Sequence, residues 1–573
     1  MLLLAVLLTA PLYTTHAQVA LRYEQNETVT WEEAIDMYRW LDEKYDQARL
    51  MEVGLTDAGR PLHLFIIDRG RTFDPEASKR SGKSILFINN GIHPGEPCGV
   101  DASLKLARDL LSGEDPYSAF LDHTVVLIVP ILNVGGALNR STTNRANQNG
   151  PVEQGFRGNA RNLDLNRDFI KLDSRNTRSL VRVLRRWDPH LFIDTHTSDG
   201  ADYPYTLTLI HSHTQRHEAT QALFIDSTLI PALYEGMDLS PYEMCPYVQS
   251  RGRSPEQGIQ AFMDYPRYTS GYASLFNTIS FTVETHMFKP FSDRVLSTWY
   301  FLREALKFSS IHGEELAQTK NRALEEKMQR KEFTLQWSLD DSRYDMIPFR
   351  GYQVKEKESK VTGLTRYYFD REAGWEEEIP HYRYFKAAQT VEAPDFYVLP
   401  SAWSEVVERL QLNGVQMHPL GSDSTVEAEV YYIDSYETAR QPYNGHYWHS
   451  DIQVRKVKQE IPLLAGDYLI PLRQEAREYL VQTLEPQGYD SFFSWNFFDG
   501  VLFRNEYFSS YIFEETAEQL LREDPELRKA FQDKRKEDPG FAGNARQQLR
   551  FIYERSPWSE VTYMRYPVYR LHD

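Results

Sequence analysis

The sequence predicts an α/β fold for about the first half of the chain and an α+β region after it. Short apolar runs alternate with segments of helical periodicity from Leu62 to about Phe288, as in layered α/β folds. Several of these runs are almost continuous in β-branched and aromatic residues, which favours strands buried on both faces of a sheet. The alternation changes after about Lys307, so we expect a different architecture in the C-terminal part.

The apolar runs give the expected strands of the first region. They are residues 62–68, 84–90, 124–133, 190–197, 206–210 and 279–286. Helical spacing covers Gly99–Leu111, which Gly113 is suited to end, and Ser174–Trp187, whose apolar residues share one side. Strands and helices therefore alternate along this region.

The C-terminal part has weaker and more varied patterns. Residues 311–334 predict a charged helix, and residues 335–390 are rich in Tyr, Glu and Arg with weak strand patterns. A second α/β-like stretch follows, with a strand at 396–400 and a helix over Ser401–Leu412. Glu514–Glu554 predicts a long charged helical region.

The charge balance argues against two classes of partner. The chain has 573 residues, with 64 Lys and Arg against 82 Asp and Glu, which gives a formal net charge of −18. This excess would repel a nucleic-acid backbone or an anionic lipid surface, so we expect neither as the principal partner. With 41% hydrophobic and 25% charged residues, the composition is that of an ordinary folded protein.

The N-terminus has the features of a secretory signal peptide. MLLLAVLLTAPLYTTHAQ is an apolar stretch followed by small and polar residues, and cleavage is expected after Ala17. The alternative is an ordinary buried N-terminal segment, because a bilayer span needs about 20 apolar residues. We therefore expect residues 1–17 to be removed and the protein to be exported, periplasmic or secreted, without an integral membrane span.

Cysteine content limits the kind of metal site that the chain can build. The 2 cysteines, Cys98 and Cys245, are too few for a disulfide framework or a cysteine-based zinc module. Any metal must therefore be held by His, Asp or Glu. His211, His213 and His217 do not share one helix face, and we expect them to be solvated loop residues.

A first pair of candidate ligands follows the strand expected at 84–90. His93 and Glu96 lie in NNGIHPGEPCG, where Gly91 and Gly95 allow the backbone to fold tightly. Open α/β sheets place their sites at the carboxyl ends of strands, and a His with a Glu supplies two of the three protein ligands of a catalytic zinc. The alternative for so short a pair is an ordinary surface turn.

A third ligand is available at the end of another strand. His196 closes an apolar run and precedes Ser198, Asp199 and Gly200, which indicate a loop. A single His at a strand end is more often structural, but two such sites in one chain favour a shared metal.

An arginine- and asparagine-rich segment lies between these two sites. GFRGNARNLDLNRDF contains Arg157, Arg161, Arg167, Asn159, Asn162 and Asn166. A solvated basic patch would explain this composition, but beside a metal site in a chain of net charge −18 it is better explained as an anion receptor. Arginine binds a carboxylate through two parallel hydrogen bonds.

Glu284 is a carboxylate inside an apolar run. It lies in ISFTVETHMF, the last of the expected strands. Burial of a carboxylate costs several kcal/mol unless the group is paired or functional, so we expect Glu284 to be a base or a ligand.

These residues resemble the pattern of the zinc metallocarboxypeptidases of the carboxypeptidase A type. That pattern is H-x-x-E, an Arg, D-x-N-R, a His after a strand and a Glu late in the domain, and all occur here in this order. The resemblance covers about residues 25–310 and implies a three-layer α/β/α domain with a mixed sheet. We therefore expect a catalytic domain at 18–310, a helical and β linker region at 311–390 and a C-terminal region of unknown role at 391–573.

The resemblance also implies a metal centre. His93, Glu96 and His196 would hold one zinc ion, with water at the open position. Asp164 would accept the second ring N–H of His93 and fix its tautomer. Glu284 would be the general base.

The same resemblance implies a receptor for substrate. Asn166 and Arg167 would bind the C-terminal carboxylate of a peptide. Arg157 would stabilise the oxyanion, and Arg145 and Arg161 are competing assignments for this role.

The family also closes a tyrosine over the bound substrate. Tyr265, Tyr268 and Tyr272 all lie in MDYPRYTSGYAS, and we favour Tyr268. A tyrosine packed in a loop is the alternative for each.

The predicted function is zinc-dependent hydrolysis of the last peptide bond of a peptide with a free C-terminal carboxylate. Glu284 would activate the water on zinc, and Asn166 and Arg167 would hold the carboxylate. One alternative is a zinc-dependent amidase for cell-wall peptides or N-acyl amino acids, because the same groups serve any amide next to a carboxylate. An alternative of another class is a catalytically inert peptide- or glycan-binding protein.

Overall fold

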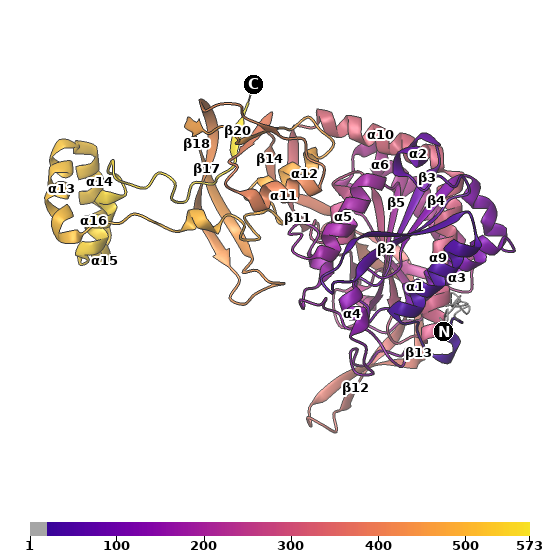
Figure 1. The fold of residues 1–573 in the computed structure, drawn as a ribbon. Coiled ribbons are helices and arrows are strands. Elements are labelled where there is room, and N and C mark those ends of the chain that lie inside the picture. The colour runs from indigo at the N-terminus through magenta and orange to yellow at the C-terminus, as the bar shows by residue number, and fades with distance from the viewer. Residues whose placement is uncertain (1–19, 573) are drawn as a thin grey trace, which may run out of the picture.

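An eight-stranded mixed sheet forms the centre of the N-terminal region in the computed structural model, which describes residues 20–572 (Figure 1). In spatial order its strands are β1 (Ala48–Leu55), β2 (Pro61–Ile67), β4 (Thr124–Val129), β3 (Ser84–Asn89), β5 (Leu191–Ser198), β10 (Ile279–His286), β6 (Leu207–His211) and β7 (Met244–Pro246). β3, β4, β5 and β10 are parallel to their neighbours in this group, whereas β2 and β6 pair antiparallel with β4 and β10. The predicted α/β fold with a mixed sheet is confirmed. The expected signal peptide, residues 1–17, lies outside the described residues.

Helices cover both faces of this sheet. In β3, Leu86 and Ile88 point to one core and Ile85 and Phe87 to the other, as the alternation of a strand requires. The first core contains residues of α1 (Trp31–Lys44), α3 (Cys98–Ser112), α7 (Ile230–Asp238) and α9 (Phe291–Ile311). The second contains residues of α5 (Arg175–Trp187) and α8 (Thr269–Ser274). Gly113 ends α3 with a left-handed φ of 74°, as expected.

The segment after α9 packs against the N-terminal region. α10 (Gly313–Gln329) is followed by β11 (Glu332–Leu339), which pairs with β14 (Phe385–Glu392). Between them, β12 (Asp345–Glu358) and β13 (Thr365–Tyr382) form a long hairpin. β13 extends a small sheet with β9 (Ile259–Gln260) and β8 (Gln249–Ser250), so residues of 311–390 share a sheet with the first region.

The C-terminal region contains a six-stranded antiparallel sheet. Its spatial order is β16 (His418–Pro419), β19 (Tyr468–Pro471), β15 (Phe396–Leu399), β20 (Tyr569–Leu571), β17 (Ser424–Thr438) and β18 (His449–Leu463). The second core, which contains residues of α5, continues into this region, because Phe276 stacks on Tyr479 of α12 (Arg477–Leu484). α11 (Ser404–Leu412) contributes Val406, Val407 and Leu410 to the same core.

The long helical region expected at Glu514–Glu554 is divided into separate helices. They are α13 (Ser510–Glu523), α14 (Pro525–Glu537), α15 (Pro539–Ala542) and α16 (Ala545–Tyr553). Pro525 and Pro539 each begin a helix, because proline suits the first turn and breaks a helix interior. Figure 1 shows these helices at the far end of the molecule from the eight-stranded sheet. No helix within residues 20–572 has the length and apolar character needed to cross a membrane.

Candidate functional site

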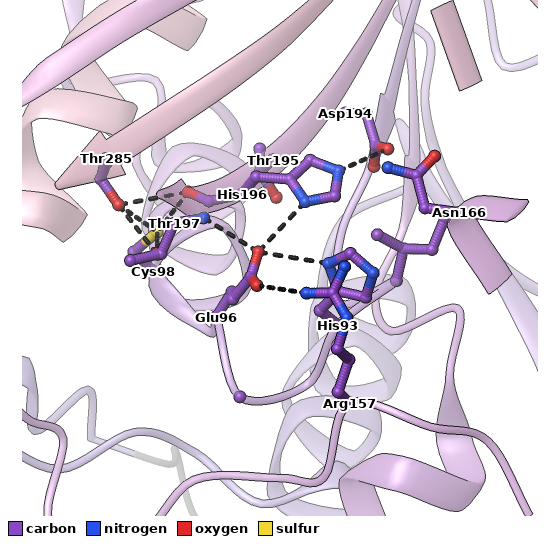
Figure 2. Close-up of polar contacts among 12 residues, drawn as sticks. His93, Glu96, Cys98, Arg157, Asn166, Asp194, Thr195, His196, Thr197 and Thr285 are labelled. Carbon is purple, nitrogen blue, oxygen red and sulfur yellow. Dashed lines mark hydrogen bonds and ion pairs between the residues drawn. The ribbon is translucent and has the colours of Figure 1, made fainter. Parts of the chain in front are cut away.

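The carboxyl ends of β3 and β5 bring the expected metal ligands together (Figure 2). His93 and Glu96 lie in the tight segment between β3 and α3, where Gly91 adopts a left-handed φ of 63°. Nδ1 of His93 and Nδ1 of His196 lie 3.4 and 3.1 Å from Oε2 of Glu96. The three side chains are buried, and one ligand atom from each lies within 4.8 Å of the others.

An aspartate binds the remaining ring nitrogen of each histidine. Nε2 of His93 lies 2.9 Å from Oδ1 of Asp164, and Nε2 of His196 lies 2.8 Å from Oδ2 of Asp194. Carboxylates in this position keep the proton on Nε2 and leave Nδ1 for a metal. Nδ1 of His93 is buried and has no hydrogen-bond partner. The donor set therefore fits the three protein ligands of a catalytic zinc.

Charged neighbours outweigh burial at these ligands. Burial opposes the protonation of His196, but Asp194 raises the pKa of His196 well above its ordinary value. Burial likewise opposes ionisation of Glu96, but His93 and Arg145 hold its pKa well below the ordinary value. A dication bound here would displace the proton of His196, so metal binding is coupled to proton release.

β10 places Glu284 beside the metal ligands. Glu284 and His196 are paired residues in the parallel β5–β10 ladder. Oε2 of Glu284 is buried and accepts no hydrogen bond. Glu284 lines a cavity of about 430 Å³, here called the site cavity, together with His93, Glu96 and His196. Burial raises the pKa of Glu284 to about 7.

The short helix η3 (Leu165–Arg167) presents Asn166 and Arg167 to the site cavity. Asp164 caps this helix by accepting a hydrogen bond of 2.9 Å from the backbone N–H of Asn166. Oδ1 of Asn166 accepts from the backbone N–H of Thr269, which leaves its amide hydrogens for a ligand. Burial disfavours ionisation of Asp164, but His93 and Arg157 hold its pKa well below the ordinary value.

Two of the three candidate oxyanion arginines line the site cavity. Arg157 donates to Oδ2 of Asp164 over 3.1 Å and to Oε1 of Glu96 over 3.3 Å. Arg145 donates to the same oxygen of Glu96 over 2.8 Å. Arg161 points elsewhere and donates to the backbone carbonyl of Asp173. The cavity thus contains Arg145 and Arg157 and lacks Arg161.

The three candidate tyrosines occupy different places. Tyr268 lines the site cavity, and the guanidinium carbon of Arg167 lies 4.5 Å from its ring centroid. Tyr265 instead donates to the backbone carbonyl of Trp337, and buried Tyr272 donates to Asn413. Tyr247, which the sequence did not single out, also lines the cavity.

The expectation of solvated loop histidines is wrong. His213 and His217 are 5% and 7% exposed. His213 bonds the backbone carbonyl of Phe262, and the ring nitrogens of His217 bond Gln221 and Ser212, whereas His211 belongs to β6. Their rings therefore satisfy buried polar groups. Within residues 20–572, the set of His93, Glu96 and His196 is the one group found that could hold a metal.

Two buried aspartates of the site were missed in the sequence. Asp194 precedes His196 in the same strand and on the same face, and this alternation was an available signal. Asp264 lines the site cavity, and neither of its carboxylate oxygens has a hydrogen-bond partner. Burial raises the pKa of Asp264 to about 7. No periodic sequence pattern around Asp264 indicates that this residue belongs to the site.

An α/β sheet with two histidines and a glutamate gathered at its strand ends is typical of zinc-dependent hydrolases. Residues 36–224 match the family model described as zinc carboxypeptidase. This segment of the chain is therefore a zinc carboxypeptidase-like domain, and His93, Glu96 and His196 fit the zinc cofactor of that family. The resemblance noted in the sequence is thereby confirmed.

Relatives named carboxypeptidase 2 align with most of the chain. Carboxypeptidase 2 of Trichophyton tonsurans is 23% identical over 429 residues, which are 72% of this chain and 74% of the relative. Probable carboxypeptidase 2 of Arthroderma benhamiae is 23% identical over 427 residues, which are 72% and 75% of the two chains. Among solved structures, a putative carboxypeptidase A from Shewanella denitrificans OS-217 aligns with a TM-score of 0.38 and 18% identity, over 50% of this chain and 69% of that chain.

Proposed function

We propose that the protein removes the C-terminal residue of peptides that have a free carboxylate. The observation that carries this proposal is the composition of the site cavity. It combines the His-Glu-His set, a partner-free carboxylate oxygen on Glu284, and the side chains of Asn166 and Arg167. This combination offers a base and a carboxylate receptor next to one metal position.

His93, Glu96 and His196 would hold the zinc through Nδ1, Oε2 and Nδ1. The bound ion would supply a Lewis acid that polarises the scissile carbonyl and lowers the pKa of water. Asp164 and Asp194 hold the proton on Nε2 of each histidine, so the proton that a bound ion would displace is the one on Nδ1.

Glu284 would move the proton of the reaction. Its free Oε2 takes a proton from the attacking water and later delivers it to the leaving amine nitrogen. A bound dication would lower the pKa of Glu284 from about 7, which keeps this carboxylate ionised near neutral pH. Arg157 would donate to the developing oxyanion, a contact typically worth about 3–4 kcal/mol.

Asn166 and Arg167 would set the register of cleavage. Arg167 offers a guanidinium that suits a carboxylate, and Asn166 lines the same cavity. Tyr268, on which Arg167 lies, would cover the bound residue. A peptide held by its terminal carboxylate presents its last amide bond to Glu284.

A matched pair of peptides tests the proposal. The enzyme should release the last residue of a peptide with a free carboxylate and leave the C-terminally amidated peptide intact. Arg167→Gln should raise KM about 10- to 100-fold, because a charge-assisted contact with the carboxylate is lost. Arg161→Gln, from the same segment but outside the cavity, is the control and should leave KM unchanged. Equal cleavage of both peptides would favour the amidase alternative, and cleavage of neither would favour an inert binding protein.

We further propose that the protein is exported, supported by the leader-like segment at residues 1–17. N-terminal sequencing of protein recovered outside the cytoplasm should begin at Gln18.

A further inference from the structure

A tight turn of the C-terminal region reaches the site. It joins β17 to β18 and consists of Tyr443, Asn444, Gly445 and His446, here called the YNGH turn. Tyr443 and His446 form an antiparallel bridge. Asn444 and Gly445 have φ values of 49° and 90°, the left-handed conformation that a two-residue hairpin turn of this type requires. The turn therefore has a defined shape.

Asn444 clamps the backbone of Asp164. Its Oδ1 accepts a hydrogen bond of 2.7 Å from the backbone N–H of Asp164, and its Nδ2 donates to the carbonyl of the same residue over 3.1 Å. These bonds fix the peptide units on both sides of the residue that holds Nε2 of His93. Asn444 thus acts on the metal ligand through one intermediate residue.

Tyr443 holds the guanidinium of Arg167. Its hydroxyl oxygen accepts a hydrogen bond of 2.7 Å from Nε of Arg167, while Nη1 of Arg167 donates to the carbonyl of Asn166. The ring of Tyr443 is itself stacked on buried Trp495, with ring planes 15° apart. Arg167 is therefore held by Tyr443, which lies outside the site cavity, and its Nη2 remains available for a ligand.

A third contact anchors the turn. Nε2 of His446 lies 2.8 Å from Oδ2 of Asp173, which also pairs with buried Lys171. The YNGH turn is consequently attached to the N-terminal region on both sides of η3. This docking brings the side chain of Asn444 into direct contact with the backbone of a residue 280 positions away in the sequence.

We propose that the YNGH turn is a positioning element of the active site, supplied by the C-terminal region. Asn444 orients Asp164 and thereby His93 and the zinc, and Tyr443 orients Arg167 and thereby the carboxylate of the substrate. The Tyr443 part rests on the proposed function, whereas the Asn444 part rests on the metal centre alone. Neither residue lines the site cavity, so both act through others.

Asn444→Gly tests the metal part. Glycine keeps the left-handed turn and removes the amide, so the fold of the turn is preserved. The Kd for zinc, measured by competition with a chromophoric chelator, should rise about threefold to tenfold. This range is expected because the lost hydrogen bonds hold Asp164, which in turn holds the zinc ligand His93. Asp451→Gly is the control, because Asp451 is a left-handed, exposed residue of the same hairpin with φ of 49°. It should leave the zinc Kd unchanged.

Tyr443→Phe tests the substrate part. It removes one hydroxyl, and KM and the inhibition constant of the released amino acid should both rise about twofold to fivefold, since the bond is partly screened by solvent. kcat and the zinc Kd should stay the same. Tyr447→Phe, an exposed tyrosine of the same loop, is the control and should change neither constant.

Separate outcomes would overturn each part. Asn444→Gly with an unchanged zinc Kd would show that the turn only covers the surface. Tyr443→Phe with an unchanged product inhibition constant, or with a change in kcat alone, would exclude orientation of Arg167. If the protein does not release C-terminal residues, the proposed function fails, but the zinc measurement on Asn444→Gly still decides the metal part.

Discussion

Two glutamates, half-buried Glu284 in the first half of the chain and fully buried Glu485 in the second, share a raised pKa but have opposite surroundings. Burial raises the pKa of both Glu284 and Glu485 to about 7. Glu485 accepts hydrogen bonds from the hydroxyls of Tyr397 and Tyr431 over 2.6 and 2.7 Å and lies 3.1 Å from Nε of Arg570. Glu284 instead leaves Oε2 without a partner at the wall of the site cavity. A raised pKa therefore does not separate Glu284, the proposed base, from a structural carboxylate, whereas the unused acceptor that faces a cavity does.

The largest effect should come from Glu284→Gln. The amide cannot take a proton, so kcat should fall about 10²- to 10⁴-fold. Zinc content by elemental analysis and the midpoint of urea unfolding should stay at wild-type values, because no hydrogen bond to Oε2 is lost. Retained turnover with zinc bound would mean that another group is the base.

Asp194 is a third case, because both of its carboxylate oxygens have hydrogen-bond partners and one of these partners is the metal ligand His196. It accepts from Nδ2 of Asn89 and from Nε2 of His196. Asp194→Asn should raise the zinc Kd about 10- to 100-fold, the usual cost of losing such a partner. Asp467→Asn is the control, since Asp467 is a buried carboxylate of the C-terminal region that accepts from backbone N–H groups of Ser401 and Leu464. A zinc Kd that moves equally in both variants would indicate general destabilisation.

The sequence was informative where side chains follow a strand or a turn. The strands that flank the site were expected within a few residues of their observed bounds, because they are buried on both faces. β1 was missed because most of its residues are exposed or half-buried, and β7 because it is short and lies at the sheet edge. Edge strands lack the continuous apolar run on which the prediction depended.

The residues that hold the predicted site residues in place were harder to predict from the sequence. Asp164 and Arg167 were identified by a local motif, but the Asn444 and Tyr443 that hold them come from another sheet. An Asn-Gly pair between two strands does predict a hairpin turn. Nothing in its spacing indicates what the turn contacts, because that depends on how the C-terminal sheet packs against the N-terminal region.

Glu485→Gln tests the structural side of the comparison. The amide leaves buried Arg570 without one of its anionic partners, so the free energy of unfolding should fall by about 1–3 kcal/mol. Chemical denaturation measures this change, while kcat and the zinc Kd should stay at wild-type values. A loss of activity in protein that is still fully folded would contradict the structural assignment of Glu485.

The smallest effect concerns Asp264, a buried carboxylate whose two oxygens, like Oε2 of Glu284, have no hydrogen-bond partner. With a pKa raised to about 7, Asp264 is neutral below this pH and anionic above it. Its charge would favour a cationic side chain on the residue to be released. The ratio of kcat/KM for a peptide ending in Lys over one ending in Gln should therefore rise severalfold between about pH 6 and about pH 8. Titration of Glu284 cancels in this ratio, because the same base serves both peptides, and the Lys side chain stays charged throughout. Asp264→Asn should flatten the profile, and a ratio that rises equally in this variant would assign the preference to another group.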